Sequence, residues 1–167
     1  YYAVAEDREQ LKISTYDLWE RTVEEFEILS RVDSSESIRG NYSNSLFYLA
    51  RATLAKNGNA DVMSLLYRSI DLDSLNYFSL NLKGLLLESR GHVEDARKIF
   101  VYIVTREPKF ASAYVNLGNL YWNEGDVESA WDIWSMGHIA LPGDRILARW
   151  TKVAEDSLKA MVQSGRL

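Results

Sequence analysis

The stretch that decides the fold runs from residue 77 to residue 144 and reads YFSLNLKGLLLESRGHVEDARKIFVYIVTREPKF followed by ASAYVNLGNLYWNEGDVESAWDIWSMGHIALPGD. Eight positions of the first line recur 34 residues later, and six of the eight pairs are identical. The pairs are Leu80 and Tyr114, Gly84 and Gly118, Gly91 and Gly125, Val93 and Val127, Glu94 and Glu128, Ala96 and Ala130, Phe100 and Trp134, and Pro108 and Pro142. A repeat of this period predicts a solenoid of stacked units.

Each unit is predicted to hold two antiparallel helices. Gly91 and Gly125 mark the turn inside each unit, and the second helices are expected to start near Val93 and Val127. Pro108 and Pro142 are expected to stop those second helices, because proline cannot continue the hydrogen-bond ladder.

A weaker copy of the same unit precedes these two. Leu46, Ala50 and Leu66 fall in register with the repeat, and Ser74 stands where the prolines fall. We expect a helix around residues 46–54, a turn at 57–59 where Gly and Asn tolerate left-handed backbone, and a helix over 60–71. The three repeats are therefore 43–76, 77–110 and 111–144.

Residues 1–42 are interpreted as a divergent N-terminal helical segment, with a short helix or the remnant of a longer one over 1–13. Ser14 offers an N-cap with Asp17 three residues on. Tyr16, Trp19, Val23 and Phe26 follow at helical spacing and predict one apolar stripe. A loop is expected over 33–37, and a second break at Gly40-Asn41.

Residues 145–163 predict a C-terminal capping helix. Its apolar seam is expected to face the repeats and its charged side chains to face water, as the end of a solenoid requires. The seam consists of Leu147, Trp150, Ala154, Leu158 and Met161.

Charge and composition narrow the classes of partner. The net charge is −5, and residues 1–36 carry ten acidic against four basic side chains. This argues against nucleic acid, which needs clustered Lys and Arg. The acidic helix over 14–31 is interpreted as a solvated cap, with a basic partner as its alternative. The absence of Cys excludes disulfides and thiolate metal sites.

Location is left open by the sequence. No apolar run approaches a membrane span. The chain begins at Tyr1 without Met, so we expect that an upstream piece was removed, and a signal or lipid anchor could have been in it. Both a cytoplasmic and a periplasmic or envelope location agree with this.

The repeated residues resemble the tetratricopeptide repeat family, whose pattern has an aromatic, Leu-Gly and Tyr on the first helix, then Ala, a large aromatic and Pro. This resemblance covers about 100 residues and implies an all-α, right-handed α-solenoid of stacked antiparallel helix pairs. Gly84 and Gly118 lie inside helices, where glycine costs about 1 kcal/mol. We expect close approach of Ala96 and Ala130 to these glycines to offset that cost.

The resemblance also implies a binding surface, because first helices line a concave face in the family. The residues carried over by register are Asn44, Phe47, Arg51 and Leu54, then Phe78, Asn81, Leu85 and Glu88, then Ser112, Val115, Asn119 and Trp122. Aromatic side chains beside amides suit capture of a peptide. The alternative is that these residues only pack against neighbouring helices. The family's clamp for acidic chaperone tails is not expected, because only Arg51 and Asn116 match it.

No catalytic set, metal site or cofactor is predicted. His92 and His138 are the only histidines, and a turn or cap role is expected for each. The preferred hypothesis is a non-catalytic scaffold that binds a protein or peptide on the concave face. The alternatives are a homodimerisation module and the docking or regulatory part of a larger enzyme or envelope complex.

Overall fold

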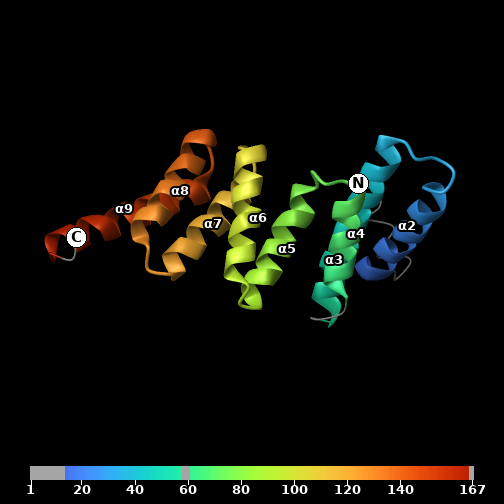
Figure 1. Cartoon of the computed structure of the whole chain (residues 1–167), viewed down its shortest axis with the longest axis horizontal. Coiled ribbons are helices and arrows are strands. Elements are labelled where there is room, and N and C mark those ends of the chain that lie inside the picture. Colours follow the sequence, from blue (N-terminus) through green and yellow to red (C-terminus); the bar gives the residue numbers. More distant parts are fainter. Residues whose placement is uncertain (1–13, 58–60, 166–167) are drawn as a thin grey trace. The chain divides into compact units, whose positions relative to one another are not determined.

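The computed structural model describes residues 14–57 and 61–165, in which every regular element is an α-helix and no strand occurs (Figure 1). The helices are α2 (Thr15–Leu29), α3 (Glu36–Asn57), α4 (Val62–Leu72), α5 (Tyr77–Ser89), α6 (Val93–Arg106), α7 (Ala111–Asn123), α8 (Val127–Ala140) and α9 (Arg145–Gln163). The chain divides into two compact units, Tyr1–Ser79 (unit 1) and Leu80–Leu167 (unit 2). The expected helix over 1–13, and the Gly and Asn of the turn at 57–59, lie outside the described residues.

In unit 1, α3 packs between α2 and α4 (Figure 1). The predicted N-cap of α2 is confirmed: the Ser14 hydroxyl accepts a hydrogen bond from the backbone N–H of Asp17 at 3.2 Å. The predicted apolar stripe is confirmed as well. Val23 belongs to a core with Tyr42, Leu46 and Leu49, and the other three members of the stripe pack against this core.

The break expected at Gly40-Asn41 is wrong, because α3 runs without interruption from Glu36 to Asn57. The loop expected over 33–37 is also too long, since Glu36 and Ser37 are already helical. One glycine costs a helix only about 1 kcal/mol. Burial of Tyr42, Leu46 and Leu49 further along the same helix outweighs that cost.

A hydrogen-bonded polar cluster lies inside unit 1. Ser43, Ser69 and Ser79 have no exposed surface, and Asn76 is 4% exposed. The hydroxyls of Ser43 and Ser69 each reach the other residue's backbone carbonyl at 2.8 Å. The Ser69 and Ser79 hydroxyls lie 2.7 Å apart, and the Asn76 amide donates to Ser43 at 2.8 Å. We call these four residues the serine cluster.

In unit 2 the helix bounds follow the 34-residue repeat. Gly91 and Gly125 have φ angles of 82° and 83°, a left-handed conformation that glycine adopts without steric cost. The second helices α6 and α8 end at Arg106 and Ala140, each two residues before a proline. A proline disfavours helical backbone at the residue before it, which accounts for the C-terminal ends of α6 and α8.

Large rings, and not the expected alanines, lie against the glycines of the first helices. A Cβ added to Gly84 would come within 2.6 Å of the Phe100 ring, and one added to Gly118 would overlap the Trp134 indole. Ala96 and Ala130 are fully buried nearby in sequence but are not the nearest atoms. The prediction of close approach is therefore confirmed, and the atoms nearest each glycine belong to an aromatic ring and not to the expected alanine.

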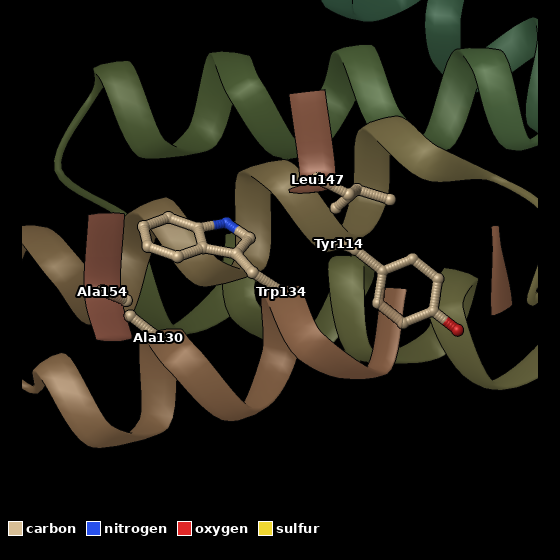
Figure 2. Packing of buried hydrophobic residues seen from close by; sticks show 5 residues of the cluster. All are labelled: Tyr114, Ala130, Trp134, Leu147 and Ala154. Atoms are coloured by element: carbon tan, nitrogen blue, oxygen red, sulfur yellow. The ribbon is translucent and has the colours of Figure 1, made fainter. Parts of the chain in front are cut away.

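Trp134 is the centre of the unit 2 core (Figure 2). Its indole stacks on Trp150 of α9, with ring centroids 5.2 Å apart, and its Nε1 donates to the Val115 carbonyl at 3.3 Å. Leu147 and Ala154 of α9 complete the cluster and are fully buried.

The outer face of α9 is charged. Lys152 pairs with Asp156 at 2.7 Å, and Lys159 pairs with Glu155. The register positions of Gly118 and Tyr121 recur in α9 as Lys152 and Glu155, so the face that receives a second helix in α7 is polar in α9. Among the helices that the structure describes, none is long and apolar enough to cross a membrane.

Candidate functional site

The first part of the candidate site is a hollow on unit 1 of about 240 Å³, which we call the Phe47 hollow. Three residues that the sequence predicted, Asn44, Phe47 and Phe78, line it. The Phe47 and Phe78 rings lie 5.6 Å apart between centroids. Phe78 is 58% exposed, whereas Phe47 is only 8% exposed because it packs between Phe78 and Tyr48. Phe47 is thus the floor of the hollow and Phe78 its exposed rim.

The wall of the Phe47 hollow comes from α2. Trp19 and Phe26 line the hollow from α2, and Tyr48 lines it from α3. Trp19 stacks on Tyr48 with ring centroids 4.5 Å apart and planes 17° apart. This stacked pair joins α2 to α3 along the wall of the hollow.

Asn44 lies at the mouth of this hollow and is exposed. Its Oδ1 accepts a hydrogen bond from the amide of Asn76 at 3.1 Å, which fixes the side chain to the serine cluster. The Asn44 amide nitrogen donates to no atom of the described residues. It is a backbone-type donor beside two rings.

A larger pocket of about 640 Å³, the Lys56 pocket, adjoins the hollow and shares the Trp19–Tyr48 wall. The predicted residue Arg51 lines it, with Lys56 and Tyr16. The Lys56 ammonium lies 4.0 Å from the Tyr16 ring centroid. The Tyr16 hydroxyl donates to Glu20 at 2.9 Å, and this hydrogen bond raises the pKa of Tyr16 and keeps it a neutral donor.

The predicted residues of unit 2 have mixed environments. Ser112 is exposed, Leu85 is 37% exposed, and Val115 and Asn119 are half-buried. Trp122 is half-buried against Trp134, with ring centroids 5.8 Å apart.

The predicted amide of Asn81 already has a partner. Its Oδ1 accepts a hydrogen bond from Asn116 at 2.8 Å, which joins α5 to α7. Glu88, at the end of the same α5 face, is partly buried, and desolvation raises its pKa. The packing alternative therefore applies to Asn81, whereas Ser112 and Leu85 remain available to a ligand.

Sequence reasoning assigned Trp19 to core packing and did not single out Tyr48 and Lys56. The signal that could have found Trp19 is its place in an apolar stripe, where a ring is large enough both to pack and to line a surface. Tyr48 follows Phe47 in sequence and faces α2, so the register of the repeats does not point to it.

The described residues contain no group of His, Asp and Glu side chains arranged to hold a metal ion. His92 precedes α6 at the turn and is exposed, and its side chain caps no backbone N–H. His138 lies in the last turn of α8 and is half-buried. The chemistry of the candidate site is therefore that of rings, amides and two cations.

No protein-family model and no curated protein matches the sequence. Solved structures do match. The Sgt2 TPR domain from Aspergillus fumigatus has a TM-score of 0.63 at 16% identity, covering 75% of this chain and 83% of that one. MamA has a TM-score of 0.61 at 14% identity, covering 88% and 86%. A monomeric mutant of IFIT1 with Gppp-AAAA has a TM-score of 0.53 at 18% identity, and the match covers 93% of this chain and 34% of the IFIT1 chain.

At such low identities the likeness shows the fold alone. It agrees with the 34-residue period, the Gly-against-aromatic packing of unit 2 and the all-helical described residues. The protein has a tetratricopeptide-repeat-like fold.

Proposed function

We propose that the protein is a non-catalytic interaction module that binds a segment of a partner protein on the face of its first helices. The observation that carries the proposal is the Phe47 hollow. Residues chosen by repeat register alone, Asn44, Phe47 and Phe78, line this one hollow beside the stacked Trp19–Tyr48 wall.

The chemistry of the hollow suits an extended peptide. A ligand side chain would lie on Phe47 against the exposed Phe78 ring, since aromatic pairs favour such contacts. The Asn44 amide would donate to a peptide carbonyl beside that side chain. An apolar pocket with a few polar groups that fix the orientation of the ligand is the usual composition of a binding site.

Unit 2 is proposed to carry a second contact set of its own, Leu85, Ser112, Val115, Asn119 and Trp122. Leu85 and Ser112 are exposed there, and Trp122 is half-buried. Nucleic acid is disfavoured as the ligand, because the chain carries a net charge of −5 and α2 has five acids and one base.

Self-association is the second candidate, and exposed aliphatic side chains favour it. Val32 is 82% exposed and Ile139 is 78% exposed. Light scattering over a hundredfold range of concentration tests it: a constant monomer mass removes the homodimer from consideration.

Selection from a library of random peptides tests the preferred function directly. Purified protein is expected to enrich peptides with a recurrent aromatic or aliphatic position, and Phe78→Ala is expected to weaken the best peptide about tenfold, as truncation of a ring at the centre of an interface does. Tyr102→Ala on α6 is the matched control, since it removes a ring that is 39% exposed and does not belong to the lining of the hollow. Fluorescence anisotropy measures both.

Two outcomes would contradict the proposal. One is that selection enriches no peptide in repeated trials with folded protein, and the other is that the Tyr102 and Phe78 variants lose affinity equally. The second result would place the binding surface elsewhere on the molecule.

A further inference from the structure

The Lys56 pocket is large enough for more than packing. Its volume of about 640 Å³ lies within the range of about 300–1,000 Å³ that is typical of ligand sites. Trp19 and Tyr48 give it a ring-lined wall, and Ala52 and Ala55 of α3 give it a shallow apolar floor. The two alanines leave room where larger side chains would fill the groove between α2 and α3.

The charged side chains that line this pocket are both cations. Arg51 and Lys56 belong to the lining, and no carboxylate does. Neither cation forms an ion pair with a described residue of unit 1. Arg68, by contrast, pairs with Glu27 at 3.3 Å.

Both cations rest on aromatic rings. The Arg51 guanidinium lies 5.7 Å from the Phe47 ring centroid, and the Lys56 ammonium lies 4.0 Å from that of Tyr16. A cation–π contact orients a cation but leaves its charge unneutralised. Arg51 and Lys56, five residues apart on α3, therefore place two oriented positive charges beside the apolar wall.

We propose that the Lys56 pocket binds an acidic side chain, Asp or Glu, within the partner segment, next to an apolar side chain that rests on Trp19 and Tyr48. The inference rests on the proposed function, because the segment in this pocket continues past the shared wall into the Phe47 hollow. An internal side chain fits this continuity, since the chain passes from one cavity to the next.

The acidic residues of α2 restrict where a carboxylate of the ligand can bind. Asp17, Glu24 and Glu25 lie on α2 but outside the lining of the pocket, and Glu20, also outside the lining, accepts a hydrogen bond from the Tyr16 hydroxyl at 2.9 Å. A carboxylate of the ligand is repelled along most of α2 and attracted at Arg51 and Lys56. Such alternation of charge fixes register and discriminates between partners more than it adds raw affinity.

The test uses random 12-residue peptides displayed on phage, with the C-terminus of each peptide fused to the coat protein. No peptide then has a free terminal carboxylate, so every carboxylate that is selected belongs to an Asp or Glu side chain. We expect wild-type protein to enrich Asp or Glu beside an aromatic or aliphatic residue. Protein with Arg51→Gln and Lys56→Gln is expected to retain the apolar enrichment and lose the acidic one. Arg39→Gln with Arg145→Gln makes the same change of net charge at exposed sites outside the Lys56 pocket and serves as the control.

The best peptide and its Asp→Asn or Glu→Gln form are then compared by anisotropy. Removal of the carboxylate is expected to weaken binding to wild type about fivefold, as suits a partly exposed ion pair, and less than twofold in the double glutamine variant. The fivefold preference should shrink when salt is raised to 0.5 M.

The failures are separable. Peptides selected without acidic enrichment, or an acidic preference that survives in the double glutamine variant, would overturn this inference and leave the proposed function standing. Binding seen only with free C-terminal peptides would assign the cations to a terminal carboxylate and overturn the internal anchor. No enriched peptide at all would remove the proposed function with it.

Discussion

Units 1 and 2 build the same helix pair with different interiors. The first-helix position that is Ala50 in unit 1 is Gly84 and Gly118 in unit 2, and the facing second-helix position is Leu66, Phe100 and Trp134 in turn. Every one of these second-helix residues is fully buried. A smaller residue on one helix is thus matched by a larger one on the other, so the helix pair is kept by conserving volume and not identity.

The second difference concerns polarity. Ser69 of the serine cluster corresponds in register to Ile103 and to Gly137, where the Tyr114 ring lies against the backbone. Unit 1 therefore fixes its helices with directional hydrogen bonds, and unit 2 fixes them with the shape of rings. A network of hydrogen bonds fails when one partner is lost, and a packed ring fails when space is removed.

The largest effect is expected from a side chain forced into the ring-on-glycine contact of unit 2. Gly118→Leu should lower the free energy of unfolding by about 3 kcal/mol or more, because even its Cβ overlaps the Trp134 indole. Urea unfolding followed by circular dichroism measures it. Gly40→Ala is the control: a Cβ there meets nothing within 4 Å, so this change should stabilise by about 0.5–1 kcal/mol. An unchanged stability of the Leu variant would refute the close approach.

A smaller loss is expected from the serine cluster of unit 1. Ser69→Ala leaves the buried Ser79 hydroxyl without a hydrogen-bond partner and removes one hydrogen bond each from Ser43 and Asn76, which should cost about 1–3 kcal/mol. Ser112→Ala, on the exposed side of α7, should change stability by less than about 0.5 kcal/mol. Equal effects of the two substitutions, measured by the same unfolding assay, would show that the cluster does not support unit 1.

The smallest effect concerns the cap of α8 and depends on pH. Hydrogen bonds from Ser129 hold the pKa of Asp126 below its ordinary value of 3.8. A lowered pKa in the folded state means that the contribution is present above the unfolded value and is lost as the pH falls through the folded one. Asp126→Ala should cost about 1 kcal/mol at pH 7, the usual worth of an N-cap.

Asp126→Asn keeps an acceptor and removes the titration. It should be nearly as stable as wild type at pH 7 and should lose less stability than wild type between pH 5 and pH 3, the range around the ordinary pKa of 3.8. Parallel pH curves for the Asn variant and wild type would contradict this assignment.

The sequence predicted unit 2 well because its boundaries are set by local residues. Gly91, Gly125, Pro108 and Pro142 act through their own backbone conformation, and no tertiary contact is needed to place them. The break predicted at Gly40 was wrong because tertiary contacts, and not the local residue, determine the structure there. The effect of Gly40 on a helix is weak, and the burial of residues further along α3 decided the outcome.

Pairing across helices is what the sequence did not contain. Three scattered serines read as surface residues until α3, α4 and α5 bring them together. The candidate site divides in the same way. Register placed Asn44, Phe47 and Phe78, whereas Trp19 entered from α2, which lies outside the 34-residue period.

The stacked pair of Trp19 and Tyr48 gives the molecule an optical reporter at its candidate site. The chain has five tryptophans, and Trp19 alone belongs to unit 1. The other four lie in unit 2, with Trp134 fully buried among them. With those four replaced by phenylalanine, the emission of Trp19 would respond to whatever enters either neighbouring cavity, without an attached dye.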